Sequence, residues 1–229
     1  MRKYVLASTL SLVCIFLLSS CSSETRSTPS TETSVTTELE PPVTSTPVPP
    51  PEPATSVLFE FASPRSVTGW ASVDDSVMGG ISASTTTWVE TNGSGALLFS
   101  GMMTTEQNGG FTSTFGPADQ RLGQAAAGST ALGVNAIGDG RTYVMQLRTS
   151  QSGQDRWIAR FTPTSTSAES SGALVALPIS SFAPVNRFLS PVTPSAPLDP
   201  ATIVQIAFYL IDEQVGYFRL AVERITAIR

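Results

Sequence analysis

The chain has 229 residues, a formal net charge of −5 and no histidine. A slightly acidic chain is a poor binder of the negatively charged nucleic-acid backbone, so we expect no nucleic-acid partner. The absence of histidine removes histidine-based catalytic triads, histidine metal clusters and the commonest general base.

Residues 1–20 have the layout of an export signal. Two basic residues precede an almost wholly apolar run, 4–18, which is too short for a comfortable membrane span. Small residues then precede Cys21 and resemble a bacterial lipobox, in which the cysteine is lipidated and becomes the mature N-terminus. An ordinary signal peptide cleaved near Ser20 is the alternative. We expect a protein exported to the bacterial cell envelope and anchored to the membrane by acyl chains on Cys21.

Residues 21–56 are expected to form a disordered linker. They consist mainly of serine, threonine, proline and glutamate, with hardly an aliphatic side chain. Such a segment cannot bury enough apolar surface to offset the entropy lost on ordering. Residues 41–53 are dense in proline and favour extended polyproline II. The linker would hold the folded domain away from the membrane surface.

Residues 57–229 are expected to form one all-β domain. Short β-rich runs recur with turn signals between them, and no stretch has a sustained helical period, which favours a sandwich or barrel. Asn92-Gly93 lies between two such runs and predicts a hairpin, because both residues tolerate positive φ. Gly138-Asp139-Gly140 predicts a second hairpin, between strands 131–137 and 141–149.

The next strands alternate apolar and polar side chains. In 141–149, Tyr143 and Leu147 point to one face and Arg148 to the other, and 155–161 has the same pattern. This pair of strands should pack one face into the core and offer the other to solvent or a ligand.

The last third of the chain contains a strand that is apolar on both faces. Residues 204–211 have this pattern, which predicts a central strand of a sandwich. A break in the alternation at Ile225 predicts a bulge near Glu223-Arg224. The proline-rich run 184–200 is expected to be a long surface connection.

Two adjacent acids, Asp74 and Asp75, are the best candidates for carboxylate chemistry. On a strand they would point to opposite faces, which does not suit a general acid/base pair, and no partner acid can be identified. Three interpretations stay open: a catalytic acid, a calcium ligand, and a turn cap that binds backbone N–H groups. We favour the cap, and expect no catalytic residue, metal or cofactor.

The glycines and tryptophans likewise allow both a structural and a binding interpretation. Gly79-Gly80, Gly109-Gly110 and the pair Gly138/Gly140 either allow positive φ and close backbone approach at strand ends or belong to a binding surface. Each tryptophan is either a sugar-stacking platform or a core aromatic, and Trp70 is expected to pack beneath its own loop.

Several short motifs follow one another along the chain in a specific order and spacing. The first is a tryptophan followed by an acid-Ser-Val-Met-Gly-Gly-x-Ser stretch. Later come Phe-Ser-Gly, Asn-Gly-Gly-Phe, Gly-Asp-Gly-Arg, a Leu-Pro segment at the end of a strand, and a terminal pair of strands. In this chain they occupy Trp70, 75–82, 99–101, 108–111, 138–141, 177–184 and 212–220. Together they resemble the complex I intermediate-associated protein 30 family over about residues 58–228.

This resemblance implies both a fold and a kind of function. Members of the family look like galactose-binding-type jelly rolls, akin to some carbohydrate-binding modules, and the mitochondrial members are assembly chaperones rather than enzymes. We therefore expect a galactose-binding-like jelly-roll β-sandwich that binds an unidentified protein partner without catalysis; a cell-surface carbohydrate-binding module that binds a glycan is the alternative. The candidate binding surface comprises Trp70, Asp74, Asp75, Met78, Gly79, Gly80, Ser82, Asn108, Gly109, Gly110, Phe111, Asp139, Arg141 and Arg148.

The chain departs from the family pattern at two places. The family usually has an arginine shortly after Gly-Gly-Phe, where this chain has Phe115. It also tends to have Arg-Gly after the Phe-x-Pro element, where this chain reads Val185-Asn186-Arg187-Phe188. If those positions contact a ligand or a partner, this chain binds differently or not at all.

Overall fold

A computed structural model describes residues 53–152, 154–164, 171–194 and 196–229. The expected export signal, Cys21 and most of the linker lie outside these residues, so the structure does not test them. Among the helices of the described ranges, none has both the length and the apolar character needed to cross a membrane.

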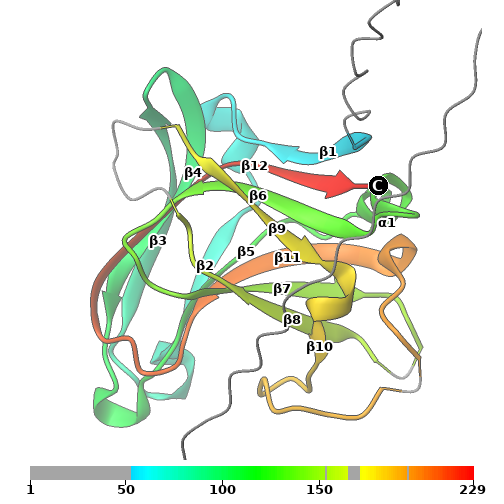
Figure 1. The fold of residues 1–229 in the computed structure, drawn as a ribbon. Helices are drawn as coiled ribbons and strands as arrows, with labels where there is room; N and C mark the ends of the chain where they lie inside the picture. Colours follow the sequence, from blue (N-terminus) through cyan, green and yellow to red (C-terminus); the bar gives the residue numbers. More distant parts are fainter. Residues whose placement is uncertain (1–52, 153, 165–170, 195) are drawn as a thin grey trace, which may run out of the picture. The chain divides into compact units, whose positions relative to one another are not determined.

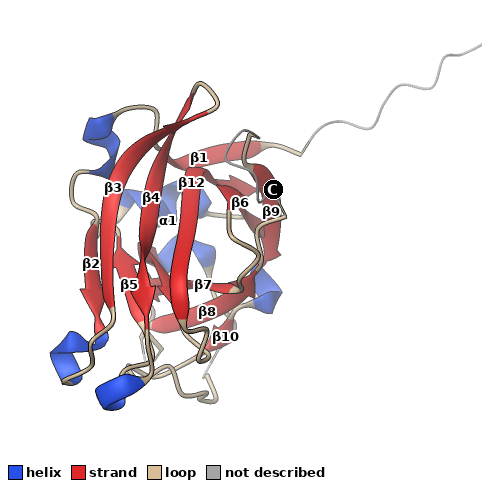
Figure 2. Ribbon diagram, turned by 90° about the vertical axis from the view of Figure 1, so that its left-hand side faces the viewer, coloured by secondary structure: helices blue, strands red, loops and turns tan. Residues whose placement is uncertain are grey.

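The described residues form a jelly-roll β-sandwich of two antiparallel sheets, as expected (Figures 1 and 2). The first sheet has the order β3 (Ala83–Thr91), β4 (Ser94–Met103), β12 (Gly216–Ile228), β6 (Ala131–Ile137), β9 (Ala173–Pro178), and β1 (Thr55–Glu60) also pairs with β12. The second has the order β10 (Ala183–Pro184), β8 (Arg156–Phe161), β7 (Tyr143–Thr149), β11 (Ile203–Leu210), β5 (Thr112–Phe115), β2 (Ala71–Asp74).

Short helical segments connect the strands. The one α-helix of the described residues, α1, spans Arg121–Ala126. Single-turn helices lie at η1 (Pro64–Val67), η2 (Asp75–Met78), η3 (Glu106–Asn108), η4 (Ile179–Ser181) and η5 (Pro200–Thr202). Two of these, η2 and η3, follow the ends of β2 and β4 and lie at the same end of the sandwich (Figure 2).

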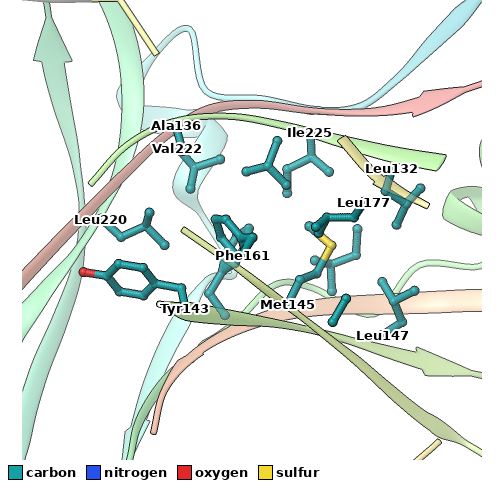
Figure 3. Close-up of a cluster of buried hydrophobic side chains, with 14 of the residues drawn as sticks. Leu132, Ala136, Tyr143, Met145, Leu147, Phe161, Leu177, Leu220, Val222 and Ile225 are labelled. Carbon is teal, nitrogen blue, oxygen red and sulfur yellow. The ribbon is translucent and has the colours of Figure 1, made fainter. Parts of the chain in front are cut away.

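The hydrophobic core lies between the sheets. Tyr143, Met145 and Leu147 of β7 are buried and point towards Leu220 and Val222 of β12 (Figure 3). Arg148 lies on the opposite face of β7 and is exposed, so the alternation that the sequence predicts for this strand is confirmed. β11 is a central strand between β7 and β5, as its two apolar faces predict.

The structure confirms the first predicted hairpin and the bulge. β3 and β4 pair antiparallel up to Thr91 and Ser94, and the turn residues Asn92 and Gly93 both have positive φ, 44° and 77°. The register between β12 and β6 shifts between Val222 and Arg224, where the phase of the apolar residues breaks.

The second predicted hairpin is wrong. β6 lies in the first sheet between β12 and β9, whereas β7 lies in the second between β8 and β11. Neither strand therefore has a free edge for the other, and 138–142 crosses from one sheet to the other. The glycine signal correctly indicated a change of direction, but it carries no information on which sheet the next strand joins.

Candidate functional site

Asp75 is the hub of the segment that the sequence singled out. Its side chain is fully buried. Its Oδ1 accepts a hydrogen bond from the Ser82 backbone N–H at 2.9 Å, and its Oδ2 accepts from the Ser82 hydroxyl at 2.5 Å. The same Oδ2 accepts from the N–H groups of Gly110 and Phe111, at 2.8 and 3.3 Å. One carboxylate therefore joins the end of β2, the start of β3 and the loop before β5.

Two glycines leave the room that this carboxylate occupies. A Cβ atom at Gly80 would lie 2.3 Å from Asp75 Oδ1, and one at Gly109 would lie 2.9 Å from Oδ2. Gly79 ends η2 in the left-handed region, with φ 91°, and Asn108 has φ 62°. Gly80 and Gly109 therefore allow close approach to the carboxylate, and Gly79 and Asn108 provide backbone with positive φ; all four have a structural role.

The environment of Asp75 favours a structural acceptor of backbone N–H groups over a catalytic acid or a calcium ligand, although the donors belong to other segments and not to its own turn. Burial by itself would raise the pKa of this carboxyl, but the hydrogen bonds from Ser82, Gly110 and Phe111 outweigh it and hold the pKa below its ordinary value. The group is an ionised acceptor surrounded by donors, which repel a cation. Within the described residues, no three Asp, Glu, Cys or His side chains gather as a metal would require.

Asp74 has a different set of partners. It accepts from the backbone N–H and hydroxyl of Ser84 on β3, at 2.8 and 2.5 Å. Asp74 is the last residue of β2 and Asp75 the first of η2. Each carboxylate has its own donors, and among the described residues no hydrogen bond joins the two acids.

Asp139 and Arg141 form a second polar network where the chain crosses between the sheets. Asp139 accepts hydrogen bonds from the Tyr143 hydroxyl, from the Arg141 guanidinium and from the backbone N–H of Arg219. Arg141 also donates to the carbonyls of Gln214 and Tyr217. This network fixes the crossing to the β11–β12 connection, so its residues have a structural role.

A groove of about 630 Å³ lies on the outer face of the second sheet. Its floor is a row of residues paired across the strands: Val73 on β2 opposes Ser113 on β5, which opposes Tyr209 on β11. The lining residues are Val73, Met78, Phe111, Ser113, Phe115, Arg160, Arg187, Phe188, Leu189, Tyr209, Ile211 and Asp212.

One wall of the groove is presented by a short turn after β10. The side-chain oxygen of Asn186 accepts from the backbone N–H groups of Phe188 and Ser190, at 2.8 and 3.1 Å. Leu189 packs on the apolar cluster of the sheet, whereas the Phe188 ring is 66% exposed. The Arg187 guanidinium lies 4.5 Å from the centroid of that ring, a cation–π distance.

The other wall depends on Asp75. Met78, at the end of η2, is 56% exposed and lines the groove together with Phe111. Both residues belong to segments that the Asp75 hydrogen bonds tie together.

Polar groups lie at the floor and at one end of the groove. Arg160 and Asp212 form an ion pair at 2.8 Å. The Tyr209 hydroxyl is 3.4 Å from the Gln146 side-chain oxygen, and burial raises the pKa of Tyr209 to about 12, so it is a neutral donor.

The structure separates the predicted site residues into groups. Met78 and Phe111 line the groove, and Asp75, Gly80, Ser82, Gly109 and Gly110 support them from below. Arg148 lies on the same sheet face but outside the lining.

The tryptophans do not form platforms in the groove. Trp70 and Trp157 are buried, and Trp70 packs between Phe208 and the rings of Phe59 and Phe61, as expected for a core aromatic. Trp88 is half-buried and donates its indole N–H to the Phe61 carbonyl at 2.8 Å.

Most residues of the groove were missed from the sequence. Two signals pointed to them. The strand 204–211 is apolar on both faces, although only one face of a sheet in a two-sheet sandwich meets the core. The two departures from the family pattern, Phe115 and Arg187-Phe188, all line the groove.

Comparisons with known proteins show the fold and then the family. The fold is that of carbohydrate-binding modules. The chain resembles the family 11 module of the cellulosomal cellulase Lic26A-Cel5E of Clostridium thermocellum, with 18% identity, a TM-score of 0.52, and coverage of 76% of this chain and 94% of that one. A family 11 module from the same organism, in complex with a β-1,3-1,4-mixed-linked tetrasaccharide, has 17% identity, a TM-score of 0.51, and coverage of 78% and 96%.

The family model for complex I intermediate-associated protein 30 matches residues 59–222. The chain belongs to this family, as the order of its motifs indicated. A search of curated proteins finds no match.

Removing the charge of Asp75 should destabilise the domain. Asp75→Asn places an amide NH₂ against groups that are themselves donors, so we expect the free energy of unfolding at pH 7 to fall by about 3 kcal/mol. Urea denaturation followed by circular dichroism measures the change. Asp74→Asn is the matched control, because Asp74 is half-buried and, among the described residues, receives side-chain hydrogen bonds from Ser84 alone. We expect a loss of about 1 kcal/mol. Equal losses would contradict the role of Asp75 as hub.

The difference in stability between the native protein and Asp75→Asn should depend on pH. Because the pKa of Asp75 is lower in the folded state than the unfolded value of about 3.9, its stabilising contribution is complete above that pH and is lost as pH falls through the lowered value. The stability gap between the native protein and Asp75→Asn should therefore narrow below about pH 4. Asp119, whose pKa is lowered by its hydrogen bonds with Arg121, is common to both proteins and cancels. A gap that stays constant between pH 7 and pH 3 would refute this assignment.

Proposed function

We propose that the protein is a non-catalytic binding module of the cell envelope that holds a segment of a partner polypeptide in the groove. The observation that carries this proposal is an open groove whose walls expose Phe188 and Met78 to solvent. Exposed apolar side chains gathered around a concavity are typical of protein interaction sites, and large rings and methionine are frequent anchors there.

The acidic groups support binding rather than catalysis. Asp75 has its oxygens occupied by four protein donors. Asp212, at the end of the groove, is held by Arg160 in a two-point ion pair. In the part of the chain that the structure describes, neither carboxylate is hydrogen-bonded to a second acid, and the family to which the chain belongs supports a binding role.

A membrane anchor at Cys21 completes the proposal. The apolar run, the small residues and the cysteine follow one another as in a lipoprotein signal. A linker rich in proline, serine and threonine then separates Cys21 from the first strand at Thr55. The groove would thus be displayed at a distance from the membrane.

Glycan binding is the second candidate. The groove has aromatic residues on its floor and walls, and the Arg160–Asp212 pair offers hydrogen-bonding groups beside them. A module with the same fold has been solved with a mixed-linked tetrasaccharide. We place this candidate second because Val73, Met78, Leu189 and Ile211 give the groove more aliphatic surface than sugar hydroxyls can use.

Site-specific crosslinking tests which ligand the groove holds. We expect a photo-crosslinking residue at position 188 to yield a discrete protein adduct in the producing cells, because this side chain stands on the groove wall. The matched control is position 217, where Tyr217 is 80% exposed on β12 of the other sheet; no adduct should form there.

Two outcomes would argue against a polypeptide ligand. Adducts of equal pattern from positions 188 and 217 would show unspecific contact. Retention on an immobilised mixed-linked glucan that is lost in Phe188→Ala and kept in Tyr217→Ala would support the glycan instead.

The anchor is tested by removing its acceptor thiol. We expect Cys21→Ser to move the protein from the membrane pellet to the supernatant after ultracentrifugation, because no acyl chain can be attached. Metabolic labelling with a radioactive fatty acid should mark the native protein alone. A Cys21→Ser protein that is processed normally and still pellets with membranes would rule out this anchor.

A further inference from the structure

The outer face of the second sheet differs in charge from the rest of the domain. Residues 57–229 contain ten arginines, no lysine and thirteen acids, so the domain as a whole is acidic. Four of its arginines, Arg148, Arg156, Arg160 and Arg187, lie on this face or on the turn that covers it.

The strand register explains how the arginines come together. Arg156 and Arg160 are on the outer side of β8, because Trp157, Ala159 and Phe161 take the inner side. Arg148 on β7 is directly opposite Arg156. Two like charges paired across neighbouring strands repel each other, so the fold gains nothing from this arrangement itself.

Only part of this positive charge is neutralised within the domain. Asp155 pairs with Arg156 at 2.8 Å and Asp212 pairs with Arg160 at 2.8 Å. In the described part of the chain, Arg148 and Arg187 take part in none of the ion pairs. Both side chains are exposed, and Arg187 is held beside the Phe188 ring, where it lines the groove.

We infer that the partner segment is acidic: it places apolar side chains in the groove and carboxylates against Arg187 and Arg148. This inference rests on the proposed polypeptide-binding function and specifies the chemistry of the ligand. The apolar floor supplies contact area, and the two unpaired guanidinium groups select for negative charge and steer its approach. The same arginines would repel a lysine-rich segment. They therefore discriminate against basic partners and also add affinity for acidic ones.

Defined peptides test the inference without knowledge of the natural partner. The probe is a fluorescein-labelled twelve-residue peptide that alternates leucine or phenylalanine with glutamate, and matched peptides carry glutamine or lysine in place of glutamate. Fluorescence anisotropy with the purified full chain gives the dissociation constants. We expect the glutamate peptide to bind about tenfold more tightly than the glutamine peptide, and this preference to shrink as salt is added.

Substitutions then locate the effect. Arg148→Gln and Arg187→Gln should each weaken binding of the glutamate peptide about three- to fivefold. Each substitution should weaken binding of the glutamine peptide by less, so that the preference for glutamate shrinks. Arg65→Gln is the matched control, because Arg65 is an exposed arginine of η1, away from the groove. Thermal unfolding should be unchanged in all three variants, since these side chains are exposed.

The outcomes separate this inference from the proposed function. If the three peptides bind equally, or if no peptide binds while the position 188 adduct forms, the partner is not selected for its acid groups and the groove remains a polypeptide site. If polygalacturonate binds in an Arg148- and Arg187-dependent manner and the glutamate peptide does not, the ligand is an anionic glycan and the inference is overturned. Absence of the position 188 adduct would instead contradict the proposed function, polypeptide binding in the groove.

Discussion

One wall of the groove depends on a single buried carboxylate. Asp75 accepts four hydrogen bonds from groups that are far apart in the chain, and its own N–H donates to the Phe111 carbonyl. Without this anion, the segments that carry Met78 and Phe111 would be joined only through the backbone, by the Asp75–Phe111 hydrogen bond and the β2–β5 pairing. The absence of side chains at Gly80 and Gly109 is the steric counterpart of this anion. The acid and glycine positions of the motif therefore act together to build a wall rather than to react.

The groove has a simple physical origin. An outer sheet face with Val144, Ile158, Ala207 and Tyr209 needs cover, and the turn after β10 supplies it over only part of the sheet, through Val185 and Leu189. The remaining apolar surface forms the open groove between that turn and the Met78–Phe111 wall. The groove therefore results from incomplete burial of one apolar sheet face. Apolar side chains of the covered part stabilise the fold, and those of the uncovered part are available to contact a ligand.

Patterns within a strand could be predicted from the sequence, and relations between distant strands could not. The alternation around Tyr143, the Asn92-Gly93 turn and the bulge before Ile225 are local properties of the chain, and all are confirmed. The predicted 131–149 hairpin is wrong because sheet membership depends on which strands compete for each edge. The acid pair does accept hydrogen bonds from backbone N–H groups, as the turn-cap interpretation expects, but Gly110 and Phe111 are 35 and 36 residues from Asp75, and sequence spacing does not reveal such donors. The groove was missed because its residues come from separate elements, and apolar faces alone do not indicate which part stays uncovered.

The pairing of β1 with β12 has a mechanical consequence. Thr55 is paired with Ile228, and the Arg229 N–H donates to the Ala54 carbonyl, so the first strand is fixed on the end of the last one. The groove belongs to the opposite sheet. Tension between an anchor upstream of Thr55 and a ligand in the groove would thus pass through the β1–β12 ladder and then across the core. A load along β1 shears all its hydrogen bonds at once, whereas a load across it breaks them singly. If the domain is tethered upstream of Thr55, this ladder is the joint whose strength sets how much force the domain withstands.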